Sequence, residues 1–315
     1  AALSAQNNDA NNYNVAVGYD AGKAVTTGIN NTLIGALAGD AMQDDSNNVA
    51  VGTQAMSSLQ ADNCVALGFA SMFAATTSTR TTAVGPSAMG AGVVTGNDNT
   101  AIGSKSQLNV TSGEFNTSLG SLSMGVGVTT GNDNTALGYR SLEDVTSGSK
   151  NIAIGPAAIG NLTTGNNNVA IGYSSMGSAN SGESKNVAVG HLTLAAMDSG
   201  TDNFNTAVGY EAGRAISTAV RNTIIGGLSG DAITTGGDNV SLGYNSLTSN
   251  TIGNSNVAIG KDSMLTNVAA DRNVAVGLGT LQAMTFSTTA DTYNTAVGYA
   301  AGQAVTSGIQ NTLMG

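Results

Sequence analysis

The 315-residue sequence has no tryptophan, one cysteine, two prolines and few charged residues. The single cysteine, Cys64, excludes an intrachain disulfide framework and says little about the cellular compartment. Only 10% of residues are charged and 4% are aromatic, against a usual charged share of roughly 25%, so two ordinary globular domains of this length would have a poor core. Hydrophobic residues still make up 41%, which is not typical of a disordered chain. The composition favours a thin, repetitive, layered structure.

Several features of binding and targeting are also missing from the sequence. The net charge is −10 and no basic run occurs, which disfavours nucleic-acid binding. No apolar stretch approaches the roughly 20 residues of a membrane-spanning helix, and the first residues do not show the charged-then-apolar pattern expected of a signal peptide. Because the first residue is alanine, we expect a processed chain or a segment of a longer one.

A five-residue block of Asn, a β-branched residue, usually Ala, an aliphatic residue and Gly recurs along the chain. It occurs 18 times, at spacings of 16 to 19 residues apart from one of 21. The motif glycines are Gly18, Gly35, Gly52, Gly68, Gly85, Gly103, Gly120, Gly138, Gly155, Gly172, Gly190, Gly209, Gly226, Gly243, Gly260, Gly277, Gly298 and Gly315. Such periodicity defines a repeat architecture. We interpret residues 14–315 as one continuous array and residues 1–13 as a lead-in from a longer chain or a preceding coil.

The block alternates with a period of two, which predicts a strand. Its second residue is Thr in nine copies, Val in eight and Ile in one, and its fourth is always Val, Ile, Leu or Met. These two positions share one face of a strand, and Asn, Ala and Gly share the other. We expect the β-branched and aliphatic residues to point inward. The face of Asn, Ala and Gly would then allow another rod to approach closely.

The remainder of each repeat is regular as well. Met or a branched aliphatic residue stands four residues after the motif glycine in most copies, and a Thr/Ser-Gly turn often follows. Glycine with Asn or Asp supplies the left-handed backbone that tight corners need. Because about 17 residues cannot bury an apolar face alone, the sequence predicts an all-β, parallel β-solenoid (β-roll) of about 18 coils of roughly 17 residues. At a strand spacing of about 4.8 Å the rod would be on the order of 85 Å long.

A longer period is superimposed on the short one. Residues 14–35 match residues 294–315 at 16 of 22 positions, and residues 205–226 form a third copy. In all three an Ala-Gly pair replaces the usual small residue and Met, which indicates duplication of blocks of coils. Because the array stops at a motif without a polar capping coil, we expect the natural polypeptide to continue or chains to stack end to end.

The string NTAVGY-x-A-G followed by TTG-x-x-NT-x-IG resembles repeats of phage tail-fibre proteins and large bacterial surface proteins. It is similar, more loosely, to the head β-roll of trimeric autotransporter adhesins, with NNVAVG at residues 47–52 and NVAIG at residues 256–260 as the nearest matches. The resemblance covers residues 14–315. It implies a homotrimeric, left-handed parallel β-roll that presents a receptor-binding tip. The adhesin heads have shorter coils, so handedness and trimer contacts do not follow from it.

Signals of catalysis are nearly absent, and we expect no enzyme and no cofactor. The only histidine, His191, occupies the position after a motif glycine where Tyr stands in other copies, which indicates a surface substitution. Cys64 replaces an Asn of the block and has no obvious histidine partner. The acidic pairs Asp44-Asp45 and Glu143-Asp144 are expected to be solvated corner residues.

Two further sets of residues could bind ligands. Six tyrosines follow motif glycines and form a possible surface stripe for sugars, although a structural ladder or packing on a neighbouring subunit is favoured: Tyr19, Tyr139, Tyr173, Tyr210, Tyr244 and Tyr299. Three aspartates in GNDN or GGDN turns are weak calcium candidates: Asp98, Asp133 and Asp238. The calcium-solenoid signature is missing and Asx turns explain the same residues, so no metal is expected.

Asn stands in its block position in 16 of 18 copies, where stacked side chains can hydrogen-bond between coils as in cross-β stacks. We expect a structural ladder of these Asn residues and the motif glycines, represented by Asn48, Asn99, Asn168, Asn256, Gly52, Gly103, Gly172 and Gly260.

Three functions remain open. The favoured one is an extracellular structural fibre, the shaft of a phage tail fibre or cell-surface adhesin, whose partner is itself and whose host-surface glycan or protein binds elsewhere. A filament subunit that polymerises end to end is the alternative. Ice binding by the recurrent Thr is disfavoured, because that position is expected to point inward.

Overall fold

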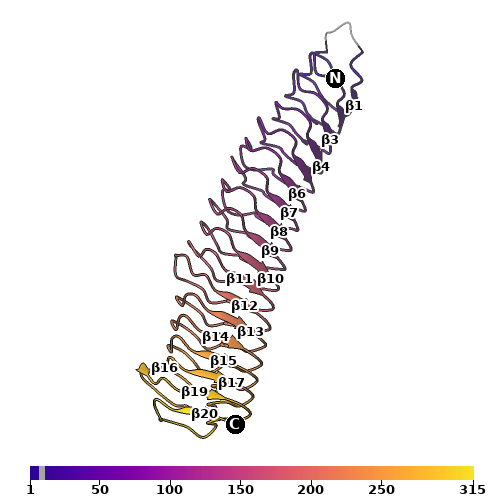
Figure 1. Ribbon diagram of the computed structural model, residues 1–315. Helices are drawn as coiled ribbons and strands as arrows, with labels where there is room; N and C mark the ends of the chain where they lie inside the picture. The colour runs from indigo at the N-terminus through magenta and orange to yellow at the C-terminus, as the bar shows by residue number, and fades with distance from the viewer. Residues whose placement is uncertain (7–10) are drawn as a thin grey trace. The chain divides into compact units, whose positions relative to one another are not determined.

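The computed structural model describes residues 1–6 and 11–315, which form strands and turns and no helix. The chain divides into two compact units, Ala1–Pro156 and Ala157–Gly315. In each unit every solenoid turn contributes one three-residue strand to a parallel sheet (Figure 1). The expected parallel β-solenoid of about 18 turns of roughly 17 residues is thereby confirmed. Of the expected lead-in, residues 1–13, residues 7–10 lie outside the described part.

Each unit contains nine three-residue strands. Those of the first unit are β1 (Val15–Val17), β2 (Thr32–Ile34), β3 (Val49–Val51), β4 (Val65–Leu67), β5 (Thr82–Val84), β6 (Thr100–Ile102), β7 (Thr117–Leu119), β8 (Thr135–Leu137) and β9 (Ile152–Ile154). Those of the second are β10 (Val169–Ile171), β11 (Val187–Val189), β12 (Thr206–Val208), β13 (Thr223–Ile225), β14 (Val240–Leu242), β15 (Val257–Ile259), β17 (Val274–Val276), β19 (Thr295–Val297) and β20 (Thr312–Met314). Two short strands, β16 (Ala270–Asp271) and β18 (Ala290–Asp291), pair with each other, and the latter lies in the 21-residue repeat.

The glycine that ends each strand permits the close stacking of turns. Gly103 has a φ of +132°, and a Cβ atom on it would lie 2.5 Å from the backbone oxygen of Gly120 in the next turn. Gly52, Gly172 and Gly260 have the same conformation and each faces the next motif glycine at an equally short distance. Any other residue would therefore be both strained and obstructed at these positions.

Left-handed backbone also occurs where the sequence did not indicate it. We expected it at corners with Gly, Asn or Asp, and Asp98 does have a φ of 58°. The turn after most strands, however, places two further non-glycine residues in this region, such as Gln54 at 60° and Met56 at 54°. The buried side chain of Met56 therefore holds a conformation that an isolated Met rarely adopts.

The expected orientation of the strand faces is wrong. The middle residue of the strand and the preceding Asn point inward: Ala50 and Asn48 are fully buried. The first and third residues, here Val49 and Val51, lie on the outside and are partly exposed. Small side chains suit the interior because the solenoid cross-section is narrow, and the interior Asn is tolerated because its polar atoms are hydrogen-bonded.

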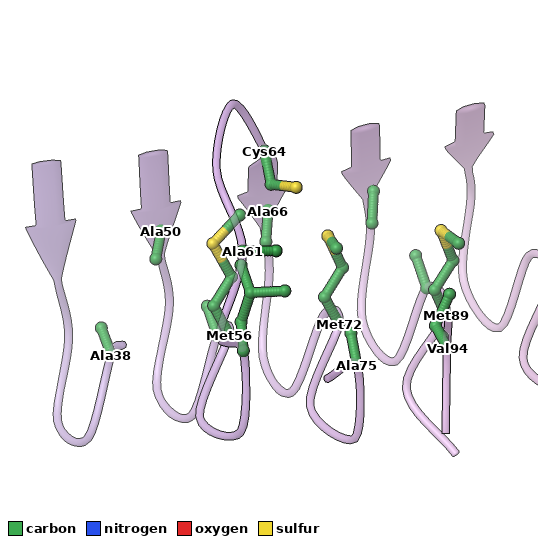
Figure 2. Packing of buried hydrophobic residues seen from close by; sticks show 14 of the residues in the cluster. Ala38, Ala50, Met56, Ala61, Cys64, Ala66, Met72, Ala75, Met89 and Val94 are labelled. Atoms are coloured by element: carbon green, nitrogen blue, oxygen red, sulfur yellow. The ribbon is translucent and has the colours of Figure 1, made fainter. Parts of the chain in front are cut away.

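The larger core side chains come from the turn opposite the strand. Met56, Met72 and Met89 occupy equivalent places in successive turns of the first unit and pack beneath the alanines of the strands (Figure 2). A second cluster in the other unit contains Leu247 and Met264 in the same role. In most turns the core layer thus consists of one small strand residue and one long turn residue.

Candidate functional site

The outward side of the strands is a regular and partly apolar surface in each unit. We call it the strand face and define it as the first and third residues of the three-residue strands in each unit. The third residues are aliphatic throughout, and Leu119, Leu137 and Leu242 remain 46%, 40% and 43% exposed. Because the side chains of neighbouring strands cover the flanks of each of these residues, the exposed part of each side chain is its outer surface.

The size of the strand face can be estimated from the sheet geometry. Nine strands about 4.8 Å apart, each three residues of about 3.3 Å, cover roughly 400 Å² in each unit. Only part of this area is apolar, because the first strand residue is Thr in nine of the 18 strands and the third is aliphatic. Exposed contiguous apolar patches of a few hundred Å² often mark interaction sites. Both units carry such a face, since the strands pair in register within each of them.

Aromatic rings follow some of the motif glycines at the ends of strands, and in three successive turns these are Tyr173, His191 and Tyr210, which we call the aromatic row. The six tyrosines predicted as a possible stripe, Tyr19, Tyr139, Tyr173, Tyr210, Tyr244 and Tyr299, are each at least half exposed. His191 lies between Tyr173 and Tyr210, with ring centroids 5.3 and 5.2 Å apart and nearly parallel planes. The histidine is therefore one rung of an aromatic stack.

The Asn ladder combines bonds between turns with bonds inside a turn. The backbone N–H of Asn48 donates to Oδ1 of Asn31 at 3.0 Å, and Nδ2 of Asn48 donates to the Ala61 carbonyl at 2.9 Å. Asn99 repeats the arrangement with the Gly113 carbonyl and the N–H of Asn116.

The other two representative asparagines make the same bonds. Nδ2 of Asn168 donates to the Glu183 carbonyl, and its Oδ1 accepts from the N–H of Asn186. Asn256 donates through Nδ2 to the Ala270 carbonyl and accepts from Asn273. The Asn side chain thus completes the backbone hydrogen bonding of each coil, a role that sequence pattern alone did not indicate.

Two of the three calcium candidates are bound to arginines of the preceding turn. Both oxygens of Asp98 accept from Arg80 at 2.7 Å, and those of Asp238 accept from Arg221 at 2.6 and 2.8 Å. These hydrogen bonds lower the pKa of Asp98 and Asp238. Asp133 occupies the equivalent left-handed position. Within residues 1–6 and 11–315, no group of three or more His, Cys, Asp or Glu side chains could hold a metal ion.

Cys64 and the acidic corner pairs are held by structural contacts. Sγ of Cys64 is buried and donates to the Ser78 carbonyl at 3.1 Å, and burial raises the pKa of the thiol to about 11. Oδ2 of Asp45 accepts from the N–H of Gln43, while burial raises the pKa of this carboxyl group. Glu143 pairs with Arg140. Asp45 and Glu143 are buried, contrary to the expectation of solvated corners.

No protein-family model matches the chain, and searches of curated proteins and of solved structures return no match either. The described residues contain no helix long and apolar enough to cross a bilayer. The strand face and the aromatic row are therefore the features from which a function has to be argued.

Proposed function

We propose that this chain is the repetitive shaft of an extracellular structural fibre in which copies associate side by side through the strand face. The observation that carries the proposal is the apolar outer row, exemplified by Leu119, Leu137 and Leu242. In each unit the strand face, roughly 400 Å² of sheet, is large enough to mark an interaction site. The resemblance of the NVAIG repeats to trimeric adhesin heads suggests three copies.

The location of the contact differs from the expectation based on the sequence. Ala and Asn of the block are buried inside each solenoid, so they are not available to a neighbouring rod. The Val, Ile, Leu and Thr side chains take that role. A regular solenoid with an apolar face is suited to a shaft because every turn repeats the same contact, and the receptor-binding part of the fibre would lie elsewhere.

Sedimentation equilibrium of the purified chain tests the proposal. We expect a trimer, and we expect the double variant Ile102→Lys, Leu137→Lys to sediment as a monomer because it places charge in the strand face. The matched control, Gln60→Lys, changes an exposed turn residue and should remain trimeric. A wild-type chain that is monomeric throughout would contradict the proposal. Electron microscopy separates a shaft, seen as rods of fixed length, from the alternative of an open end-to-end polymer.

Ice binding is a second candidate because the structure removes the objection raised from the sequence. The position with nine Thr points outward, as Thr135 in β8 shows, and recurs at the regular spacing of the strands. A flat array of methyl and hydroxyl groups can order water along its length. Thermal hysteresis measured at a few tenths of a millimolar protein would support this function, and its absence in a chain shown to be monomeric would reject it.

A further inference from the structure

Strands β12 and β19 of the second unit each lie between two exposed aromatic rings. One ring stands directly before the block Asn, two residues before the strand, and the other stands directly after the motif glycine, two residues after the strand. The pairs are Phe204 with Tyr210 and Tyr293 with Tyr299, and these side chains are 52%, 55%, 50% and 77% exposed. In the other complete turns of this unit at least one of the two positions is not aromatic, so the fold itself does not require the rings.

The two positions border the strand face on opposite sides. We call the residues before the block Asn the leading edge and the residues after the motif glycine the trailing edge. Side chains alternate along a strand, which turns both positions toward the same side as the first and third strand residues. A molecule that covers the strand face therefore meets the ring of Phe204 at one edge and that of Tyr210 at the other.

The two edges differ in their chemistry. The leading edge carries cations beside its rings: Lys185 Nζ lies 4.9 Å from the centroid of the Phe204 ring, and the Arg272 guanidinium lies 5.7 Å from that of Tyr293. Arg221 is a third cation of this edge. The trailing edge carries the stacked rings of the aromatic row and a single cation, Lys261. Because cations are attracted to ring faces, a leading edge is complementary to a trailing edge.

The direction of a neighbouring copy decides which edges meet. A rotation about an axis along the solenoid keeps two copies parallel and brings the leading edge of one to the trailing edge of the next. A two-fold axis across the solenoid makes them antiparallel and brings like edges together.

The pairing order β12, β13, β14, β15, β17, β19 shows the consequence of an antiparallel contact. With β12 packed on β19 of another copy, β13 packs on β17, and Arg221 faces Arg272. Their aspartate partners in the same chain weaken this repulsion, but the cations are also kept away from the rings of the trailing edge. Charge complementarity therefore favours parallel copies.

We propose that copies of this chain pack parallel and in register through the second unit, with Phe204 of one copy against Tyr210 of the next and Tyr293 against Tyr299. This arrangement rests on the proposed association through the strand face and names its direction and its anchoring residues.

The rings also select one register. The strand face presents similar residues in every turn, so the face alone allows a neighbour to shift by one turn at little cost. Such a shift separates Phe204 from Tyr210 and Tyr293 from Tyr299 at the same time. Aromatic pairs contribute beyond the area that they bury, and tyrosine is enriched among the residues that dominate binding energy at interfaces.

Cross-linking of the full chain tests the direction and the register. The reagent is a bismaleimide that spans about 10 Å, the distance between packed sheets, and only links between chains raise the mass on a denaturing gel. We expect the double variant Phe204→Cys, Tyr210→Cys to form covalent oligomers. The antiparallel probe Phe204→Cys, Tyr293→Cys and the single variant Phe204→Cys should remain uncross-linked. The native Cys64 is buried and is present in all three.

Truncation of one ring tests its contribution to assembly. Phe204→Ala should raise the dissociation constant measured by sedimentation at least about tenfold. The matched control is Phe115→Ala, which removes a ring of similar exposure at the leading edge of β7, where the trailing edge holds Ser121. It should change the dissociation constant less than about threefold. Far-UV circular dichroism confirms that each variant is folded.

The possible failures can be told apart. Cross-linking of the antiparallel probe, or an oligomer in which Phe204→Cys, Tyr210→Cys gives no link, would overturn the parallel arrangement and leave association through the strand face standing. An effect of Phe204→Ala no larger than that of Phe115→Ala would overturn the anchoring role of the ring pairs. A chain that is monomeric throughout would overturn both this arrangement and the proposed function.

Discussion

Gly22 lies directly against Leu33 of the next turn: a Cβ atom on Gly22 would come within 2.7 Å of Leu33 Cδ1. The same relationship joins Gly213 to Ile224 and Gly302 to Leu313. In most other turns the turn residue is Met or Leu and the strand residue is Ala. The solenoid therefore has two kinds of core layer. In one the turn residue is large and the strand residue is small, and in the other the turn residue is glycine and the strand residue is large, so the total side-chain volume is conserved.

This exchange predicts the behaviour of Ile224. The variant Ile224→Ala should lower the free energy of unfolding by about 2–4 kcal/mol, because the neighbouring Gly213 and Gly230 have no side chains that could fill the resulting cavity. Adding Gly213→Met and Gly230→Met should restore at least half of the loss, since Met holds the left-handed conformation at the equivalent position of other turns. Denaturant titration measures both effects. A triple variant no more stable than Ile224→Ala would contradict the two-layer description.

The motif glycines and Gly227 should differ sharply in their tolerance of alanine. Gly103→Ala is expected to cost about 3 kcal/mol, because its Cβ would lie 2.5 Å from the Gly120 oxygen in a backbone that L residues avoid. Gly227→Ala meets only an ordinary 3.6 Å contact and should change stability by less than about 0.5 kcal/mol. Denaturation midpoints of the two variants provide the comparison. Equal midpoints would show that glycine stacking does not determine the turn spacing.

Much of the fold can be predicted from the sequence because the pattern is repeated, so the features that all copies share can be told from the residues that vary between them. Eighteen copies of one block reveal the strand, the turn and their period. The direction of the strand face was not predictable from alternation, since a period of two separates two faces without saying which is buried. Because Val and Ile are more hydrophobic than Asn and Ala, hydrophobicity alone predicts that Val and Ile are the buried residues of the strand. The narrow interior and the hydrogen bonds of buried Asn48 reversed that choice.

The candidate site was predictable only in part. The tyrosines stand out when the repeats are aligned, but the stacking of His191 between two of them depends on the register of neighbouring turns. Glu183 gave no signal, yet it is buried and accepts hydrogen bonds from the N–H groups of Ser199 and Gly200 at 2.9 Å. Such contacts join residues that are separated by one turn, and no local pattern reveals them.

Removing one Asn of the ladder should be costly, and adding one should be favourable. Asn99→Ala leaves the N–H of Asn116 and the carbonyl of Gly113 without their side-chain partner, for a loss of about 2–4 kcal/mol. Cys64→Asn supplies the missing amide in the same ladder and should gain about 1 kcal/mol. Asn109→Ala, which removes an exposed side-chain bond to Val126, is the control and should stay within about 0.5 kcal/mol. Thermal melting of the three variants shows whether the stabilisation comes from the buried Asn ladder or from any Asn side chain that makes a hydrogen bond.

Two aspartates of the second unit should respond to pH with opposite signs. Burial raises the pKa of Asp231, whose Oδ1 is buried without a hydrogen-bond partner, whereas Arg221 lowers the pKa of Asp238. A raised pKa means that ionised Asp231 destabilises the fold near neutral pH, and the penalty disappears as the pH falls through the folded-state value. A lowered pKa means that Asp238 stabilises the fold above its unfolded value near 4, and this contribution is lost as the pH falls through the folded-state value.

Serine replacements at both positions measure these signs, because serine stands at equivalent positions in other turns, Ser57 and Ser255. At pH 7, Asp231→Ser should be more stable than the original chain, and Asp238→Ser should be less stable by under about 1 kcal/mol, as for a partly exposed ion pair. Both differences should shrink as the pH is lowered below 4, because both carboxyl groups become protonated. Denaturation at pH 7, 5 and 3.5 provides the test, and a loss of stability in Asp231→Ser at pH 7 would show that its carboxylate is satisfied in the folded chain.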